Sequence, residues 1–357
     1  MMAAKAMPVI EVRGSYREVG RQIGESLRPL VQAVTAQSHE DLIPGVGWED
    51  MQRQGQLYLV TSRAIYPQFV TELEGIAEGA NVSFEELFLV MCEELWTPAA
   101  WRGCTDFAAR GRATVNGATL LAHTNDRPPW TEDEMVILKV QAGDEPEFLG
   151  VSTGGVGYSA GFNAAGIVLT GNELACNDIR PGVPRTLIVR AILAARRLGE
   201  ALDACLLPQR ASNYNNIIAD PHGEVYSMEG SATDCEAIYI ADDILAHANH
   251  YVSPAMRQYE ADRNTIGNSI LRHNRALRLL RDNFGRLSPE LFQTLLADHA
   301  NYPASICKHD GESVTVFSMI VNPAERRAWI GHGRPCQTTY YEYTLAPWIP
   351  PADWPRV

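Results

Sequence analysis

One of the seven cysteines of this chain, Cys104, lies in a setting that suggests chemistry. Gly103 precedes it and Thr105 follows it. Upstream lie about 100 residues of mostly helical pattern, and downstream runs a long series of short strand patterns. This arrangement is typical of a protein that cuts its own chain before a cysteine and then uses the freed residue as an N-terminal nucleophile.

The residue types at this position fit that chemistry. A thiol is a strong nucleophile because some thiolate exists near neutral pH. A free α-amine titrates at about 7.7–8.0, so the nitrogen of Cys104 becomes a base only after the peptide bond is cut. Gly103 permits backbone conformations that are closed to other residues, which would help the thiol reach the carbonyl it must attack. The alternative is that Cys104 is a small apolar residue of the core.

Composition limits the classes of function. A chain of 357 residues with 46% hydrophobic and 20% charged residues is typical of a globular protein of one or two domains. The net charge of −13 argues against a nucleic-acid-binding role. The first residues have no long apolar core and no run has the length of a membrane span, so we expect no signal peptide and no membrane partner. An odd number of cysteines without a CxxC motif indicates neither a disulfide framework nor a structural zinc site, so a reducing, cytoplasmic location is expected.

The first third of the chain has helical periodicity. Apolar residues recur at steps of three to four from Tyr16 to about Gln37, and a second helical stretch covers 48–78. A capping-box pattern with Ser83 as N-cap and Glu86 at the third helical position announces a third helix. Later helical blocks are predicted at about 185–206 and 256–299, the second broken at Gly285 and restarted at 288–290.

Between these blocks the period changes to that of strands. The predicted segments are 119–123, 135–141, 147–152, 166–170, 216–219, 224–228, 237–240, 314–320 and 328–330. Turns rich in Gly, Asn, Asp or Pro separate them, and their spacing implies mainly antiparallel pairing. Helical blocks around runs of strands predict an α+β protein in which helices pack outside two stacked sheets.

Several segments together resemble the acyl-coenzyme A:6-aminopenicillanic acid acyltransferase family, also called isopenicillin N acyltransferase-like, of the N-terminal-nucleophile hydrolases. They are Arg13–Gly24, Glu74–Ala80, Gly103–Thr105, Gly157–Asn172, His247–Tyr251, Ser305–His309 and Gly333–Cys336. Each segment is weak alone, but their number and order make the resemblance fairly specific. It implies a four-layer αββα sandwich in which Cys104 is the nucleophile.

The resemblance also implies roles for residues around Cys104. Asp126 matches an aspartate that would orient the amine and steer self-cleavage, and its alternative is a turn residue. Asn249 matches the family's oxyanion-hole asparagine, since a neutral amide can point its NH2 group at a developing oxyanion. Arg127 stands where an aromatic residue is common in the family, which puts the substrate pocket in doubt rather than the nucleophile.

Four further residues are candidates for substrate binding or for support of the site. Asn163 and Asn172 fall in the Gly-rich hairpin, where a purely structural turn role is the alternative. Lys308 occupies a late position where a basic residue near the site is expected, although a solvated surface lysine would look the same. Glu229 follows the end of a strand and would act from behind the site.

The histidines offer a different mechanism. His250 suggests a Cys-His pair of the papain type, although no papain-like motif surrounds Cys104. His123 and His247 are expected to be structural. Histidines at 247 and 250 raise the question of a metal ion, but no third ligand lies nearby in sequence, so we expect no metal.

These inferences give one leading hypothesis. The chain is expected to cut itself between Gly103 and Cys104 into a mostly helical segment 1–103 and a catalytic segment 104–357 that stay together as one compact unit. Cys104 would form an acyl-enzyme with a small N-acyl amide or acyl thioester, and water or an amine would take the acyl group. No cofactor is expected, although acyl-CoA is a possible acyl donor. The rival hypothesis is an unprocessed binding protein with a structural cysteine.

Overall fold

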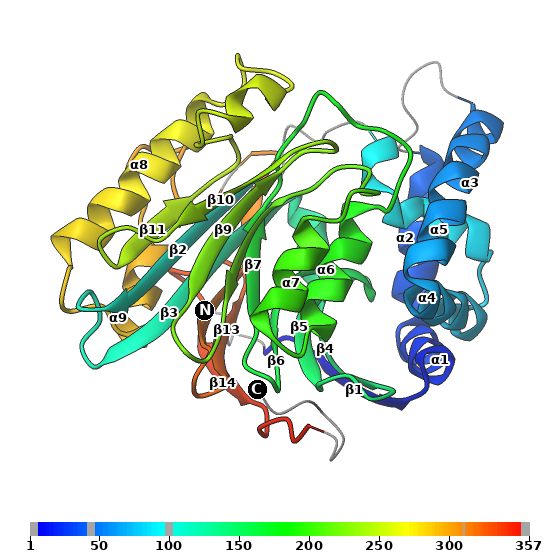
Figure 1. Cartoon of the computed structure of the whole chain (residues 1–357), viewed down its shortest axis with the longest axis horizontal. Coiled ribbons are helices and arrows are strands. Elements are labelled where there is room, and N and C mark those ends of the chain that lie inside the picture. The colour runs from blue at the N-terminus through cyan, green and yellow to red at the C-terminus, as the bar shows by residue number, and fades with distance from the viewer. Residues whose placement is uncertain (1–5, 41–46, 97–102, 310, 351–357) are drawn as a thin grey trace.

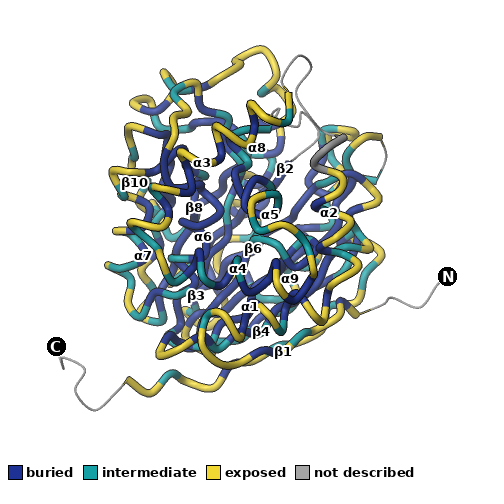
Figure 2. Tube along the Cα trace, turned by 90° about the vertical axis from the view of Figure 1, so that its right-hand side faces the viewer, coloured by how far each residue is buried: buried dark blue, intermediate teal, exposed yellow. Residues whose placement is uncertain are grey.

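The computed structural model describes residues 6–40, 47–96, 103–309 and 311–350, and these form four stacked layers (Figure 1). Two β-sheets lie in the middle, and helices cover the outer face of each sheet. Buried positions concentrate in the inner layers, whereas exposed positions lie on the helices and loops outside (Figure 2). The expected αββα sandwich is confirmed.

The first sheet has eight strands in the order β1-β4-β5-β6-β7-β8-β9-β10. All neighbouring pairs are antiparallel except β1 and β4, which run parallel. Its strands are β1 (Val9–Gly14), β4 (Met135–Ala142), β5 (Phe148–Thr153), β6 (Val156–Asn163), β7 (Val168–Asn172), β8 (Asn215–Ala219), β9 (Val225–Gly230) and β10 (Cys235–Tyr239).

The second sheet has six antiparallel strands in the order β11-β2-β3-β12-β13-β14. They are β11 (Ile244–His247), β2 (Gly103–Gly111), β3 (Gly117–Arg127), β12 (Val314–Asn322), β13 (Arg327–His332) and β14 (Tyr340–Thr344). The strand that begins with Gly103 and Cys104 is therefore an inner strand between β11 and β3.

In the described part of the chain, seven helices lie on the side of the eight-stranded sheet, namely α1 (Tyr16–Ser26), α2 (Arg28–Glu40), α3 (Trp48–Ile65), α4 (Pro67–Ala80), α5 (Phe84–Met91), α6 (Arg185–Ala194) and α7 (Leu198–Cys205). Helices α8 (Gly267–Asp282) and α9 (Pro289–Leu296) cover the six-stranded sheet. Short 3-10 helices occur at η1 (Glu93–Leu95), η2 (Pro129–Glu134) and η3 (Met256–Tyr259).

Side-chain alternation along the strands separates three cores. On β2, Phe107 points toward α8 and α9, whereas Ala108 points toward the space between the sheets. On β4, Ile137 fills the same inter-sheet space, and its neighbour Leu138 packs under the helices of the opposite outer layer. The inner strands of both sheets are therefore buried on both faces, whereas the edge strands β1, β10 and β14 are partly exposed.

Local signals located most helices. Ser83 caps α5 by accepting a hydrogen bond from the backbone of Glu86, and Ser288 caps α9 with Pro289 at the first helical position. The long helix expected from Tyr16 is divided at Leu27 into α1 and α2, and the stretch 48–78 is divided before Pro67. Pro67 divides the helix because proline lacks the backbone donor that a continuous helix requires. The strands that the sequence did not predict are β1, β2, β6, β11 and β14.

Helices α1 and α4 cross so closely that only glycine fits at the contact. A Cβ atom on Gly20 would lie 1.9 Å from the carbonyl oxygen of Glu72, and one on Gly24 would lie 2.2 Å from that of Ile76. Gly75 and Gly79 meet α1 in the same way from the other side. The segments of the sequence around these glycines therefore serve helix packing.

Replacing Gly24 by alanine should destabilise the protein. The added methyl group must push backbone from backbone, and overpacking of this kind costs roughly 1–3 kcal/mol. Thermal and urea unfolding would measure the effect. Gly199→Ala is the control, because a Cβ on Gly199 of α7 meets nothing within 4 Å and its midpoint should stay unchanged or rise. Equal midpoints for Gly24→Ala and the wild type would show that the helices can separate without cost.

Candidate active site

Cys104 is the second residue of β2 and is buried, with its side chain on the wall of a cavity of about 640 Å³. Antiparallel pairing sets Cys104 opposite Asn125 of β3 and Gly103 opposite Asp126. The β2–β3 register therefore places Asn125 and Asp126 directly beside Gly103 and Cys104. A structural cysteine of the core need not face a cavity, so this position favours a reactive role.

Backbone and side-chain groups hold Cys104 at a fixed orientation. Its backbone nitrogen donates a hydrogen bond of 2.8 Å to Asn249 Oδ1, and the same oxygen accepts one of 2.9 Å from Arg272 Nη2. Asn249 Nδ2 donates to the backbone carbonyl of Glu173 at 3.1 Å. Asn249 thus contacts Cys104, as expected. The contact is a hydrogen bond in which the amide oxygen of Asn249 accepts from the backbone nitrogen of Cys104.

Arg272 is a residue of the site that the sequence did not reveal. It reaches from α8 to the start of β2, is buried, and donates through Nη1 to the carbonyl oxygen of Cys104 and to Thr105 Oγ1. Its Nε donates to Asn268 Oδ1 at 2.7 Å. Burial lowers the pKa of this guanidinium, while the nearby Asp126 and Cys104 raise it. In the sequence it is one of several arginines in a helical stretch, and nothing there distinguishes it.

Asn125 is a second residue that the sequence did not single out. Its Nδ2 lies 3.5 Å from Cys104 Sγ, and its Oδ1 accepts a hydrogen bond of 2.8 Å from Arg127 Nε. These contacts fix which end of the amide faces the thiol. A hairpin turn at 115–117 does not by itself predict this pairing, because the register of β2 and β3 shifts between Ala109 and Gly111.

Asp126 and Lys308 form a charged pair next to Gly103. Asp126 Oδ2 lies 3.1 Å from Lys308 Nζ, and Oδ1 accepts a hydrogen bond of 2.7 Å from Thr315. A Cβ atom on Gly103 would lie 2.9 Å from both Asp126 Oδ2 and Lys308 Nζ. The structure thus places Lys308 beside the expected cleavage site rather than on a solvated surface, and the absence of a side chain at Gly103 makes room for the pair.

The environment of the thiol keeps it protonated. Burial raises the pKa of Cys104 to about 12, with Asp106 and Asp126 contributing in the same direction. Arg127 and Arg272 oppose this shift. At neutral pH a thiol with such a pKa carries its proton, so it reacts only when a base removes that proton during the attack.

The cavity beside Cys104 has an apolar wall and a polar rim. Its apolar lining includes Val90, Met91, Val156, Leu169 and Val189, and its charged lining consists of Glu93, Asp126, Arg127, Glu134 and Glu173. Arg127 also donates to Ser159 Oγ at 3.2 Å, and burial raises the pKa of Glu134 although Arg127 lowers it. Arg127 therefore lines the cavity, at the position where the family commonly has an aromatic residue.

Asn163 does not contact this cavity. Its Nδ2 donates to the carbonyls of Leu193 and Ala195, and its Oδ1 accepts from the backbone of Ala165 and Ile167. All of these bonds organise the turn between β6 and β7 and attach it to the end of α6. The structure corrects the expectation of substrate binding for Asn163 to a structural role.

Asn172 and Glu229 lie behind the site, on either side of His247. The ring of His247 bonds to Asn172 Oδ1 at 2.9 Å through Nδ1 and to Glu229 Oε1 at 2.6 Å through Nε2. Burial raises the pKa of Glu229, but the hydrogen bonds from His247, Val252 and Ser253 outweigh it and the pKa is lowered. This buried chain supports the end of β11, from which the segment carrying Asn249 starts.

His250 points away from the thiol. Its Nδ1 bonds to Ser269 Oγ at 2.7 Å, and its ring stacks with that of His247 and meets that of His273 edge-to-face. Within the described residues, the hydrogen bonds of Cys104 go to Asn125, Asn249 and Arg272. This geometry gives no support to a Cys-His pair built on His250.

The sequence model of the family described as acyl-coenzyme A:6-aminopenicillanic acid acyl-transferase matches residues 113–337, which is more than half of the chain. The chain belongs to this family. The matched stretch includes Asn125, Asp126, Asn249 and Arg272 and begins after Cys104. Membership makes the chain an enzyme of acyl transfer or amide hydrolysis, as the resemblance implied.

Curated relatives of similar length support this assignment. The chain is 27% identical over 282 residues to the 40 kDa form of acyl-coenzyme A:6-aminopenicillanic-acid-acyltransferase from Emericella nidulans, covering 76% of each chain. It is 26% identical over 307 residues to the β-alanyl-dopamine/carcinine hydrolase of Drosophila melanogaster, covering 75% of this chain and 78% of the relative. One of these relatives is named for acyl transfer and the other for hydrolysis.

Solved structures give weaker likenesses. A mutant of conjugated bile acid hydrolase from Clostridium perfringens aligns with a TM-score of 0.45 and 10% identity over 70% of this chain and all of that one. Penicillin V acylase from Agrobacterium tumefaciens aligns with a TM-score of 0.37 and 14% identity over 64% of this chain and 83% of that one.

None of the helices in the described part of the chain combines the length and apolar content that a membrane crossing requires.

The histidine cluster behind the site should make the protein sensitive to acid. Burial lowers the pKa of His250 to about 4 and that of His273 to about 3, with neighbouring histidines adding to the effect. Both values lie below the unfolded value of about 6.5, so these histidines bind fewer protons in the folded state. The free energy of unfolding should therefore fall as pH drops from about 6.5 toward 4, by about 1.4 kcal/mol per pH unit for each proton.

Urea unfolding between these pH values would measure this loss. His273→Phe should give a shallower decline because one titrating group is removed, whereas exposed His222→Gln should leave the slope unchanged. Equal slopes for His273→Phe and the wild type would show that other groups cause the acid sensitivity.

Proposed function

We propose that this enzyme cuts its own chain between Gly103 and Cys104, and then uses Cys104 as an N-terminal nucleophile on a small N-acyl amide or acyl thioester. The observation that carries the proposal is the position of Cys104. Cys104 lines a cavity large enough for a small molecule, while Asn249 Oδ1 holds its backbone nitrogen. One residue thereby offers a nucleophile to the cavity and a nitrogen that cleavage converts to a base.

The first reaction activates the enzyme. Cys104 Sγ attacks the carbonyl carbon of Gly103, the thiol proton passes to the nitrogen of Cys104, and the carbon–nitrogen bond breaks. The product is a thioester between Gly103 and Sγ, which water hydrolyses to leave a carboxylate on Gly103 and a free thiol and amine on Cys104. The Asp126–Lys308 pair lies beside Gly103, where it would steer this cleavage and afterwards orient the new amine.

The second reaction acts on the substrate. The α-amine of Cys104 takes the thiol proton as Sγ attacks the substrate carbonyl, which a thiol with a pKa of about 12 requires. The Nδ2 groups of Asn249 and Asn125 would donate to the developing oxyanion, since each carries two hydrogens. The leaving amine or thiol takes the proton from the α-amine, and an acyl-enzyme on Cys104 remains.

The final step decides between hydrolysis and transfer. Water attack releases an acid, whereas attack by an amine gives a new amide, and the relatives in Emericella and Drosophila are named for these two outcomes. The apolar wall of the cavity fits an acyl chain, and the Arg127 guanidinium on its rim fits an anionic group of the substrate. Acyl-CoA is a candidate acyl donor, and the acyl-enzyme chemistry needs no cofactor.

Denaturing intact-mass measurement tests the processing step. The wild type should give two fragments that divide between Gly103 and Cys104, because thiol attack cuts that bond. Cys104→Ala should give one uncut chain and no acyl transfer, and Cys104→Ser should be cut but should turn over slowly, since an alcohol is the weaker nucleophile. Cys235→Ser, a free cysteine on β10, is the control and should be processed like the wild type.

A single intact mass for the wild type after prolonged incubation would contradict the proposal. It would favour the rival, an unprocessed binding protein with a structural Cys104. A thiol that also resists iodoacetamide in the folded protein would complete the case for that rival.

Asn249→Ala tests the oxyanion donor. Turnover per processed chain should fall roughly 10²–10³-fold. The thermal midpoint should also fall, because the buried Arg272 loses an acceptor, so turnover is compared at a temperature where both proteins are folded. A series of chromogenic N-acyl anilides with straight acyl chains of increasing length would report turnover, and intact mass would report the processed fraction. Asn264→Ala, in an exposed turn, is the control. Normal processing together with unchanged turnover would remove Asn249 from the oxyanion site, and failure to process would place it at the oxyanion of self-cleavage.

A further inference from the structure

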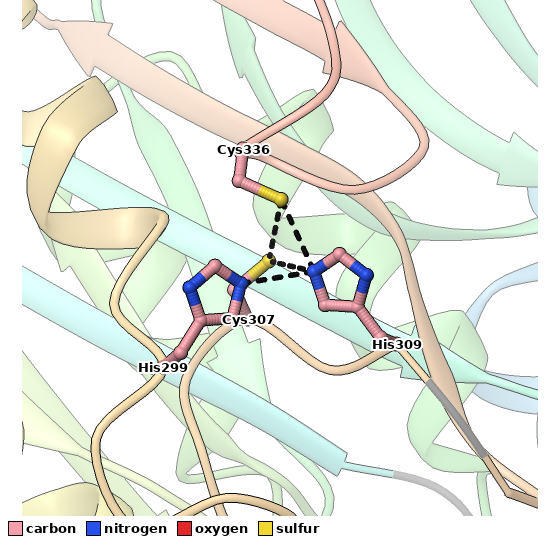
Figure 3. A group of neighbouring side chains, drawn as sticks. All are labelled: His299, Cys307, His309 and Cys336. Atoms are coloured by element: carbon pink, nitrogen blue, oxygen red, sulfur yellow. Dashed lines mark hydrogen bonds between the residues drawn. The ribbon is translucent and has the colours of Figure 1, made fainter.

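Four potential metal ligands meet on the outer side of the six-stranded sheet, although the sequence led us to expect no metal. They are His299, Cys307, His309 and Cys336, and their ligand atoms all lie within 4.8 Å of one another (Figure 3). His299 follows α9, Cys307 and His309 lie in the segment before β12, and Cys336 lies in the turn between β13 and β14. Three separate segments therefore converge on one point.

Two of the separations between these atoms match those of a tetrahedral metal site, and two are somewhat shorter. Metal–sulfur bonds of about 2.3 Å and metal–nitrogen bonds of about 2.0–2.1 Å set ligand separations of about 3.8 Å for S···S, about 3.6 Å for S···N and about 3.3 Å for N···N. The two sulfurs lie 3.8 Å apart, and Cys307 Sγ lies 3.6 Å from His309 Nε2. Cys336 Sγ and His299 Nε2 lie 3.1 Å and 2.9 Å from the same nitrogen, somewhat closer than that geometry.

We propose that these four residues form a structural Zn²⁺ site. Two thiolates and two neutral imidazoles in a tetrahedral arrangement are the donor set that Zn²⁺ prefers. Binding of the ion replaces the protons of the Cys307 and Cys336 thiols, so formation of the site releases up to two protons and changes no oxidation state. Four protein ligands close the coordination shell, which suits a structural rather than a catalytic ion.

A disulfide between the two cysteines is the main alternative. Both cysteines are free, and their 3.8 Å sulfur separation is well beyond the bond length of about 2.05 Å. A disulfide would also not explain why His309 Nε2 lies near both sulfurs and why His299 Nε2 points at the same nitrogen. The metal accounts for all four side chains, whereas the disulfide accounts for two.

The site would hold a segment that reaches the active centre. Lys308 lies between the ligands Cys307 and His309, and its backbone nitrogen donates to Thr315 Oγ1, which in turn donates to Asp126. Its ammonium group pairs with Asp126 beside Gly103. An ion that fixes residues 307 and 309 therefore fixes the base of Lys308. Any effect on processing rests on the proposed function, whereas metal binding itself does not.

Metal content tests the site without reference to activity. Wild-type protein is purified under reducing conditions, stripped with a chelator, offered one equivalent of ZnCl₂, desalted and analysed by inductively coupled plasma mass spectrometry. The variants are Cys336→Ser and His299→Gln, both at exposed positions where substitution should not disturb folding. Cys235→Ser is the matched control, because it removes a cysteine outside the cluster. Circular dichroism confirms that each variant is folded.

The wild type and Cys235→Ser should each retain about one Zn²⁺ per chain, and Cys336→Ser and His299→Gln should each retain less than about a tenth of that. Co²⁺ offered in place of Zn²⁺ should give the strong visible absorption of a tetrahedral site, with a thiolate charge-transfer band that Cys336→Ser loses. Folded, reduced wild type that retains no ion would overturn the proposal. So would equal retention by Cys336→Ser, or an as-purified mass lower by two hydrogens that shows a Cys307–Cys336 disulfide.

Discussion

The geometry of Cys104 depends on a single buried guanidinium. Arg272 extends from α8, outside the six-stranded sheet, to the carbonyl of Cys104 on β2 and to the amide oxygen of Asn249 after β11. A buried charge is stable only when its donors are matched, and here Asn268 and Thr105 complete the set. Helix, strand and loop are thereby held in one arrangement, so the thiol and its amide partner cannot move independently.

The charges around the thiol explain why an N-terminal nucleophile suits this fold. Asp106 and Asp126 lie close enough to raise the pKa of Cys104 further above the value that burial imposes, and the guanidinium groups of Arg127 and Arg272 only partly oppose them. A thiolate is therefore costly here in the resting protein. Chemistry at such a thiol needs a base at hydrogen-bonding distance, and the nitrogen of the same residue would supply one once it is a free amine.

The sequence predicted what local signals specify. Serine caps, the proline of α9 and turn residues located most helices and strands. The order of helical blocks and runs of strands predicted the two stacked sheets. Strand β2 was missed because nearly all of it is buried on both faces, which removes the alternation that marks a strand. Arg272, Asn125 and the cluster around His309 depend on contacts between distant segments. Asn163 shows the reverse error, because a Gly-rich hairpin near the site uses its asparagine to hold the turn.

The same acceptor can serve both stages of the proposed reaction. Before cleavage, Asn249 Oδ1 accepts the amide hydrogen of Cys104, which fixes the plane of the scissile peptide. After cleavage, that nitrogen is an amine with a lone pair, and a hydrogen bond from it to the same oxygen would turn the lone pair toward Sγ. Because Arg272 holds Asn249 Oδ1 in place, the amide cannot flip and its Nδ2 stays at the carbonyl of Glu173, a residue that lines the cavity. One asparagine would then position the base with its oxygen and meet the oxyanion with its nitrogen, which requires no rearrangement between self-cleavage and turnover.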